Sequence, residues 1–418
     1  MKKQISNELK LLLFSALIGA AAGIVFWLFL FVVNRGTWVL WEMIPERYCR
    51  FSFYPLAVCT VGGFVIGLFR KMNGDYPEDM MTVLGKMKKD GTYPYQKMPV
   101  LLIAALLPLI IGSSVGPEAG MVGIVVALCC WAGDNLRFAG QKSRYFSKVG
   151  AAVTLSVMFR SPLFGILDVE EGIEGEEDDG SGNGNAKGLK KSTKIMIYCI
   201  AVGAGFGCFA VLSRYIFKVS EGFPTFEKIA VSSADCILYV VYIFAGLVLG
   251  LFFEWMEKLF EKAHAGLPAV AGETLAGAVL GAVATFLPVI RFSGEEQMGI
   301  LITDFWKYAP LAMIGIAFLK ILMTTMCIKL GLKGGHFFPL IFAAVCLGYG
   351  ISLLIFPGNE THAVFAAAVV TAATLGVTMK KPLAASLLLL ICFPANALLW
   401  IVPAAALASF AGKLIGEN

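Results

Sequence analysis

Long apolar runs separated by short polar connections form the main pattern of this sequence. Each run is long enough to cross a bilayer, or most of it, as a helix. The runs cover residues 11–33, 54–69, 99–132, 150–169, 196–217, 237–253, 270–290, 310–330 and 337–356, and a stretch from 363 almost to the end. Because several exceed one span, we expect some to hold two tilted or broken helices.

The composition agrees with this pattern. Hydrophobic residues make up 58% of the 418 residues and charged residues 15%, which is typical of a polytopic all-α membrane protein and excludes an ordinary soluble domain. The first run follows three lysines and lacks a small-residue cleavage site, so it predicts a retained helix rather than a signal peptide. Basic residues crowd connections 70–98 and 134–149, which predicts that these and the N-terminus are cytoplasmic. The net charge of +5 therefore reflects basic residues in connections expected on the cytoplasmic side, and it does not indicate a nucleic-acid partner.

Cysteine and histidine spacing gives no sign of a metal site. The ten cysteines form no CxxC pair, and the three histidines lie far apart in the chain. Neither a disulfide framework nor a zinc site is indicated, so no metal and no cofactor is predicted.

A hydrophilic insert at 168–194 divides the chain. Its acidic part, 168–179, predicts a solvated cytoplasmic loop; a calcium or regulatory site is the alternative, although the acids lack the ligand spacing of an EF-hand. We therefore expect an N-terminal membrane repeat at 1–180, a flexible linker at 181–194 and a C-terminal membrane repeat at 195–418.

The two sides of the insert resemble each other. "VMFRSPLFGIL" at 157–167 is similar to "VTMKKPLAASL" at 377–387, and "GSSVGPEAG" at 112–120 is similar to "GLKGGHFFP" at 331–339. Elements repeated in the same order predict two homologous halves, which in membrane proteins commonly enclose a substrate site at the bilayer midplane.

The glycine-rich breaks at 112–120 and 331–339 predict the chemistry of that site. Unpaired backbone groups are tolerated at membrane depth only where they line a cavity or are buried in protein. Both breaks lead directly into apolar helical runs, so the N–H groups of the first turn and the positive end of the helix dipole are expected to face the cavity. Helix N-termini used in this way bind anions, so the substrate is expected to be an anion.

These segments resemble those of the CLC chloride channels and transporters. "GSSVGPEAG" is similar to the family's G-[RK]-E-G-P, "GGHFFP" to its G-x-F-x-P, "SPLFGILDVEE" to its A-P-L-x-G-x-L-F-x-x-E-E, and "NGDYPED" more loosely to its G-S-G-I-P-E. The resemblance implies a divergent prokaryotic member in a bacterial inner membrane. It also implies a fold of two inverted-topology repeats with many short tilted and broken helices, and a homodimer with one pore in each subunit.

The departures from the family motifs bear on mechanism. In the family, the glutamate of G-[RK]-E-G-P is the gate and proton carrier, and the ungapped match places Val115 there. The second proton carrier falls on Gly172, or on Glu171 with a gap of one residue. Without these carboxylates the residues resemble those of a passive channel.

Glu118 opens an alternative. It stands in the first turn of the expected helix, where the dipole favours a carboxylate, either as a structural helix-start group or as a displaced gate. The family's two anion-binding hydroxyls are also replaced: Gly74, followed by Asp75, stands at the serine, and Asn396 or Leu398 falls near the tyrosine. Asp75 would repel anions unless it points away, pairs with a cation or caps a helix starting near Pro77.

The backbone N–H groups of 114–116, His336 and Phe337 are then the expected ligands. The His336 side chain is either a filler facing protein or a titratable charge near the pore. The expected anion pathway comprises Gly74, Asp75, Ser114, Val115, Gly116, Pro117, His336, Phe337, Phe338 and Asn396, with Glu118 and Glu171 as candidate gates or proton carriers.

Three functions stay open at the level of sequence. The first is a passive channel or uniporter for a small inorganic anion such as chloride, and the second is a proton-coupled anion exchanger using Glu118, with His336 or Glu171 as relay. The third is a transporter of another solute, or a nonconducting relative, on the same fold. An enzyme is not expected, because no motif combines a nucleophile, a base and an orienting group.

Overall fold

The structure is a computed structural model of the whole chain. It describes residues 2–48, 51–80, 82–83, 85–86, 93–135, 143–159, 161, 191–219, 223–226, 229, 231–268 and 270–416. Throughout these ranges the regular structure is helical apart from one isolated β-bridge, in agreement with the all-α prediction.

Within the described part of the chain, eight helical segments are long and apolar enough to cross a membrane. They cover 11–47, 54–73, 195–215, 233–264, 310–329, 337–355, 360–379 and 395–415. Shorter apolar helices cover 98–110, 118–132, 271–286 and 382–391. This is the composition of a multi-pass membrane protein.

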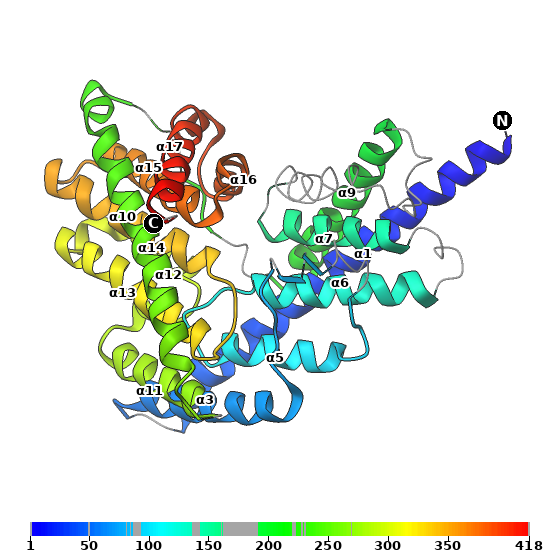
Figure 1. The fold of residues 1–418 in the computed structure, drawn as a ribbon, viewed down its shortest axis with the longest axis horizontal. Coiled ribbons are helices and arrows are strands. Elements are labelled where there is room, and N and C mark those ends of the chain that lie inside the picture. The colour runs from blue at the N-terminus through cyan, green and yellow to red at the C-terminus, as the bar shows by residue number, and fades with distance from the viewer. Residues whose placement is uncertain are drawn as a thin grey trace. The chain divides into compact units, whose positions relative to one another are not determined.

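The helices follow the predicted runs closely (Figure 1). Their bounds are α1 (Lys2–Trp38), α2 (Ile44–Arg47), α3 (Tyr54–Asn73), α5 (Met98–Ile110), α6 (Glu118–Asn135), α7 (Ser143–Met158), α9 (Lys191–Tyr215), α10 (Ser233–His264), α11 (Ala271–Phe286), α12 (Glu295–Asp304), α13 (Pro310–Lys329), α14 (Phe337–Ile355), α15 (Glu360–Met379), α16 (Pro382–Leu388) and α17 (Leu398–Gly416). The run at 99–132 divides into α5 and α6 at the glycine-rich break, as expected for a run longer than one span.

Three differences from the sequence predictions concern connections. α7 begins inside the basic stretch 134–149, and a further helix, α12, follows Gly294 between two predicted runs. α9 begins inside the segment predicted as a linker. The acidic part of the insert, 168–179, lies outside the described residues, so the domain boundary and the loop's role stay predictions.

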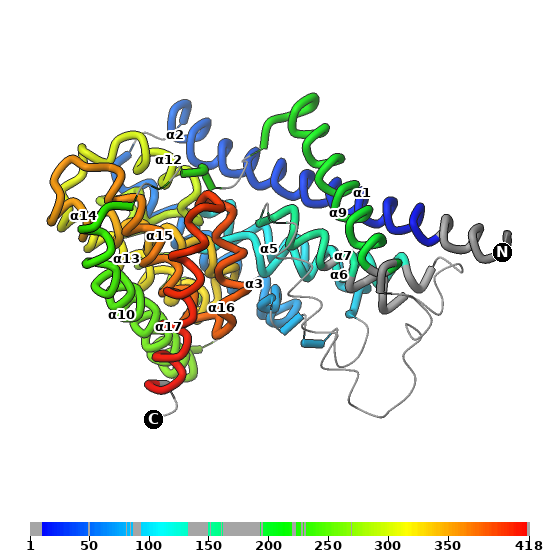
Figure 2. Tube along the Cα trace, turned by 90° about the horizontal axis from the view of Figure 1, so that it is seen from above, coloured from blue at the N-terminus to red at the C-terminus, as the bar shows by residue number. Residues whose placement is uncertain are grey.

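The described chain forms two compact units. Unit 1 contains Met1–Gly36, Tyr76–Leu106 and Glu118–Ser220. In it, α1 lies directly against α9 (Figure 2), and a Cβ built on Gly19 would lie 2.0 Å from the Ala201 carbonyl oxygen. Gly23 and Gly205 approach equally closely, with 2.3 Å from a Cβ on Gly23 to the Gly205 carbonyl oxygen. Small residues thus let two membrane helices pack backbone to backbone.

Unit 2 contains Thr37–Asp75, Leu107–Pro117 and Glu221–Asn418. Its centre is the pair α14 and α15, in which 83% of the most apolar window of each helix is buried. A helix that is apolar on all sides either lies in a protein core or spans a membrane, and α10, α13 and α17 cover this pair (Figure 1). Unit 2 contains both segments that join at the candidate site.

Candidate functional site

The site is built from two glycine-rich breaks, each between two helices. The first break, 111–117, follows α5 and precedes α6; the second, 330–336, follows α13 and precedes α14. Gly112 and Gly331 have φ values of 81° and 108°, a region in which L side chains are strained. Glycine is therefore required at these two turns, where the chain leaves one helix and changes direction.

The two breaks are joined by a pair of backbone hydrogen bonds. The N–H of Gly116 donates to the Gly335 carbonyl at 2.8 Å, and the N–H of Gly335 donates to the Gly116 carbonyl at 2.7 Å. Segments more than two hundred residues apart in the chain thus meet where the repeat and the motifs predicted a shared site. The pairing satisfies backbone N–H and C=O groups that would cost free energy if they stayed without hydrogen bonds in the hydrocarbon region.

These bonds narrow the predicted set of anion ligands. The N–H of Val115 donates to the Ser113 carbonyl at 2.8 Å, and the N–H of Gly116 is taken by Gly335. Both were expected to face an ion, but in this conformation they are committed to carbonyl oxygens. Pro117 has no N–H to offer.

Val115 fills the junction of the two breaks. Its side chain is fully buried, and a Cβ placed on Gly334 would lie 2.4 Å from its Cγ2 atom. The isopropyl group therefore rests on bare backbone, and a longer side chain at 115 has no room without a shift of the second break.

Two hydroxyl groups in the first break are buried beside Val115. The Ser114 hydroxyl lies 3.1 Å from the hydroxyl of Thr324 on α13. The Ser113 hydroxyl is buried and has no hydrogen-bond partner among the described residues. A buried hydroxyl without an acceptor is a donor available to an anion. The sequence reading missed Ser113 and Thr324, although "GSS" and "TT" lie inside the apolar runs.

The second break leads into α14 through three aromatic residues. His336 is the N-cap residue of α14, and its ring lies 5.2 Å from that of Phe253 and 4.4 Å from that of Phe337. Phe338 stacks on Phe223 at 4.9 Å. This packing fits the reading of His336 as a filler between rings, although its protonation stays a prediction.

Glu118 is the first residue of α6 and is fully buried. A carboxylate at this position is stabilised by the first-turn N–H groups and by the helix dipole. The geometry agrees with a helix-start group, and a role as displaced gate stays a prediction.

Lys320 is a buried lysine that the sequence analysis did not single out. It lies in the middle of α13, fully buried, and its ammonium group donates to the carbonyls of Ile290 at 2.9 Å and Phe292 at 2.6 Å. A third carbonyl, that of Arg291, lies at 3.3 Å. Phe292 donates to the carbonyl of Gly112 at 3.2 Å, so the lysine supports the turn behind the first break. A charged residue halfway along the predicted apolar run 310–330 was the available signal.

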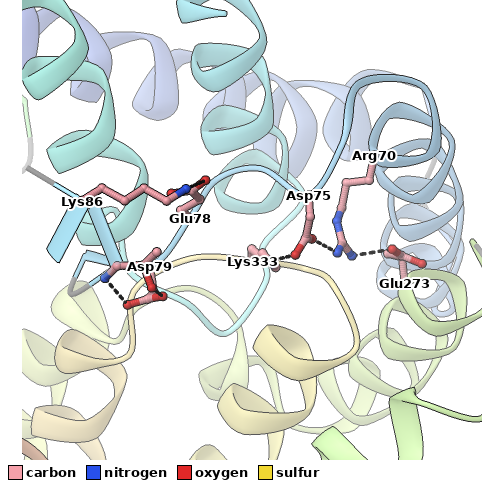
Figure 3. A network of polar contacts seen from close by, with 8 residues as sticks. Arg70, Asp75, Glu78, Asp79, Lys86, Glu273 and Lys333 are labelled. Carbon is pink, nitrogen blue, oxygen red and sulfur yellow. Dashed lines mark hydrogen bonds and ion pairs between the residues drawn. The ribbon is translucent and has the colours of Figure 1, made fainter. Parts of the chain in front are cut away.

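Asp75 lies among cations and caps no helix. Its carboxylate pairs with Arg70 and, at 2.5 Å, with the ammonium group of Lys333 (Figure 3). The prediction that Asp75 caps the next helix is wrong: that helix begins at Met80, and Asp79 accepts from the N–H of Thr82 at 2.9 Å. Two cations attract the Asp75 carboxylate more strongly than the N–H groups of a helix several residues away. The alternative, that Asp75 pairs with a cation, is confirmed.

The electrostatics of Asp75 follow from these contacts. Partial burial alone would raise the pKa of its carboxyl group, but Lys333 and Arg70 hold that pKa below the usual 3.8. The carboxylate is therefore ionised at neutral pH. Gly74 ends α3 with φ of 101°, which accounts for a glycine where the resemblance leads one to expect serine.

The remaining expected residues lie elsewhere or outside the described part. Asn396 stands in the turn Ala395–Ala397, is exposed, and donates to the Ile229 carbonyl at 3.1 Å. Glu171 and Gly172 lie outside the described residues. Within the described ranges no group of three His, Cys, Asp or Glu side chains is placed to hold a metal ion.

Known proteins resemble this chain over most of its length. The model of the voltage gated chloride channel family matches residues 56–413. The voltage-gated ClC-type chloride channel ClcB of Escherichia coli strain SMS-3-5 is 24% identical over 348 residues, which are 79% of this chain and 77% of ClcB. ClcB of Shigella boydii serotype 18 matches to the same extent.

Solved structures share the fold. A slow cyanobacterial Cl⁻/H⁺ antiporter superposes with a TM-score of 0.76 at 18% identity, covering 97% of this chain and 95% of the antiporter. A CLC-type fluoride/proton antiporter superposes with a TM-score of 0.71 at 15% identity over the same shares. These similarities confirm the predicted CLC-type fold.

The family match also bears on the class of protein. Members of this family are channels and transporters, so the expectation that the chain is not an enzyme is confirmed. The match over residues 56–413 leads to one assignment: the chain belongs to the voltage-gated chloride channel (CLC) family.

Proposed function

We propose that this protein is a passive channel or uniporter for a small inorganic anion such as chloride. The observation that carries the proposal is Val115, an uncharged side chain buried at the junction of the two breaks, where the family motif has a glutamate. Valine neither binds a proton nor competes as an anion. Anion passage is therefore not tied to proton movement at this position.

The residues available to the anion are neutral donors. Ser113 and Ser114 supply buried hydroxyls in the first break, and the N-terminus of α14 supplies the positive end of a helix dipole. Such groups stabilise an anion through their dipoles, which favours release as well as binding. The Gly116–Gly335 pairing and the packing of Val115 on Gly334 close the junction in this conformation, so passage requires the two breaks to separate.

A second candidate is proton-coupled anion exchange with Glu118 as gate. The supporting observation is a fully buried carboxylate three residues after Val115, at the start of α6. Structural relatives of this chain include a Cl⁻/H⁺ antiporter and a fluoride/proton antiporter, so both chloride and fluoride belong in any assay.

Proteoliposome flux distinguishes the two candidates. Vesicles loaded with chloride, fluoride or nitrate are diluted into impermeant salt, and anion efflux and internal pH are recorded together. The passive proposal predicts anion efflux without uphill proton movement. Proton uptake driven by the anion gradient would contradict the passive proposal and support the proton-coupled exchanger. The absence of flux for all of these anions would contradict both proposals.

Glu118→Gln then tests the gate directly. If Glu118 is a helix-start group, the anion flux and its pH dependence stay as in the wild type. A gate would instead lose its pH dependence when the carboxylate is replaced by an amide. Glu296→Gln, a change of the same kind in the first turn of α12, is the matched control.

The setting of the protein is part of the proposal. We place it in a bacterial inner membrane as a homodimer with the N-terminus in the cytoplasm, from the basic connection 70–98 and the family resemblance. Protease access to the N-terminus in inverted vesicles, and the mass of the purified protein in detergent, measure these two points.

A further inference from the structure

The ion-pair network around Asp75 joins two distant parts of unit 2. Arg70, near the end of α3, pairs with Glu273 in the first turn of α11 at 2.5 Å and with Asp75 just beyond α3. Lys333, in the second break, pairs with the other carboxylate oxygen of Asp75 at 2.5 Å (Figure 3). Two cations and two carboxylates thus form one chain of contacts, which ends at Lys333.

The two ends of this network differ in exposure. The side chains of Glu273 and Arg70 are 7% and 13% exposed, whereas those of Lys333 and Asp75 are 25% and 63% exposed. A Cβ on Gly331 would lie 1.9 Å from a guanidinium nitrogen of Arg70, so that group lies directly against the turn of the second break. Glu273 and Gly331 fix the guanidinium, while Asp75 stays in contact with water.

The guanidinium also keeps a spare donor. The Nε atom of Arg70 is buried and has no hydrogen-bond partner among the described residues. Asp75 occupies one other nitrogen of that group and Glu273 another. Arginine presents five N–H donors, so the site has unused capacity to bind a further acceptor.

Lys333 lies next to the junction of the breaks. Gly334, the following residue, packs on Val115, and Gly335 pairs with Gly116. The Cα atoms of Lys333 and Gly335 are at most about 7 Å apart, because two trans peptides span no more. The ammonium group of Lys333 is therefore partly exposed and lies on the second break, next to the buried junction.

We propose that Lys333 and Arg70 form a binding subsite for a small monovalent anion at the water-exposed end of the pathway, and that Asp75 is its built-in competitor. We call this pair the Lys333 subsite; the inference rests on the proposed function. The Asp75 carboxylate carries one negative charge and accepts from both cations, which are the interactions that an incoming halide would make. An anion arriving from water binds when Asp75 swings out, an exchange that costs little because the carboxylate is already 63% exposed.

The concentration dependence of anion flux tests this competition. Asp75→Asn keeps the size of the side chain and removes the competing charge, so the chloride concentration for half-maximal flux should fall about two- to fivefold, the range expected for one exposed ion pair. Lys333→Gln removes the cation and should raise that concentration by a similar factor. In the Lys333→Gln background, Asp75→Asn should have little further effect, because competitor and anion share the same cation.

Controls separate this role from a structural one. Asp304→Asn breaks the exposed pair between Asp304 and Lys307 at 2.8 Å, outside the network, and should leave the half-saturating concentration unchanged. Lys333→Arg keeps the positive charge, so its half-saturating chloride concentration should equal that of the wild type. Size-exclusion profiles show which variants are folded. If Asp75→Asn reduces folding, Asp75→Ser, which also removes the competing charge, is measured in its place.

The outcomes are distinct. An unchanged or raised half-saturating concentration in folded Asp75→Asn, while the wild type conducts, would overturn the subsite and leave the proposed function intact. Equal effects of Asp75→Asn and Lys333→Gln in the same direction would also overturn it, because both would then act only on structure. Wild-type vesicles that pass no small anion would overturn both proposals.

Discussion

The junction at Val115 and the network at Asp75 belong to the same pathway in this proposal but treat charge in opposite ways. At the junction the residues are glycine, valine and serine, and the side chains of Ser113, Ser114 and Val115 are buried. At the network, Arg70, Asp75 and Lys333 pair within reach of water. An unpaired charge is expensive at membrane depth and inexpensive at the water boundary. The comparison suggests that this chain has placed its anion-mimicking carboxylate at the mouth of the pathway, where the family motif has one inside it.

Lys320 is the exception that tests this comparison most severely. It is a buried lysine behind the first break, and its amino group donates to three backbone carbonyls. Lys320→Met leaves those acceptors without a donor, and we expect a loss of stability on the order of 3 kcal/mol, since each buried unsatisfied acceptor costs roughly 1–3 kcal/mol and removal of the buried charge offsets part of that. Thermal unfolding in detergent should show a fall of several degrees.

Lys307→Met is the matched control for this change. The Lys307 side chain is 61% exposed and pairs with Asp304 at the surface, so its loss should alter stability by less than about 1 kcal/mol. Equal melting temperatures for Lys320→Met and the wild type would show that the carbonyls do not need the ammonium group, and that the buried charge has another reason to be there.

Gly334→Ala tests how tightly the junction is packed. The added methyl group would lie 2.4 Å from Val115 and 3.0 Å from the Gly116 carbonyl, so the paired breaks must shift, at a cost of about 1–3 kcal/mol. We expect lower stability and altered anion flux.

The control for that substitution is Gly315→Ala in α13, where nothing lies within 4 Å of the added methyl group. Alanine in an open helical position should stabilise by up to about 1 kcal/mol. If both alanine variants behave alike, the close contact between the two breaks is absent in the working protein.

Val115→Glu returns a carboxylate to the junction. The new anion competes with the substrate, and we expect flux at neutral pH to fall about tenfold, which corresponds to about 1.4 kcal/mol. Flux should recover as pH falls, because protonation removes the competing charge. Val115→Gln has the same size without the charge and should show no such recovery; identical pH profiles for the two variants would contradict the assignment of position 115.

The smallest expected effect concerns the pH response of Asp75. Lys333 and Arg70 hold the pKa of the Asp75 carboxyl group below 3.8. The ion pairs of Asp75 therefore contribute fully to stability above the pKa that this group has in the unfolded chain, and they are lost only as the pH falls through the lower pKa of the folded protein. The difference in half-saturating chloride between the wild type and Asp75→Asn should therefore be constant from about pH 5 to pH 8. A difference that disappears toward pH 5 would mean that the carboxylate is not held by two cations.

Much of the fold follows from the sequence, because bilayer thickness imposes length and composition on each helix. The long runs became helices, and the run at 99–132 divided at its glycines, since breaks of this kind exist in membranes only where backbone groups find partners. The repeat predicted that the two breaks contribute to one site, and Gly116 pairs with Gly335 there. This pairing uses the N–H of Gly116, which the sequence predicts as an anion ligand.

The sequence does not show which side chains pair over long distances. "NGDYPED" contains three carboxylates near one another, and no local rule shows that Asp79 caps the helix while Asp75 turns to Lys333, more than two hundred residues away. Lys320 likewise acquires its role from tertiary neighbours, the backbone carbonyls of residues 290–292. Long-range side-chain pairs depend on the fold, and a single sequence does not encode them as a pattern.

The zero-current voltage of the wild-type protein in a planar bilayer tests the central claim most directly. With equal chloride on both sides and a tenfold proton gradient, passive anion conduction predicts a zero-current voltage of zero that moves only when chloride is changed. A zero-current voltage that shifts with the proton gradient would contradict the account, because protons would then be coupled to the anion despite Val115.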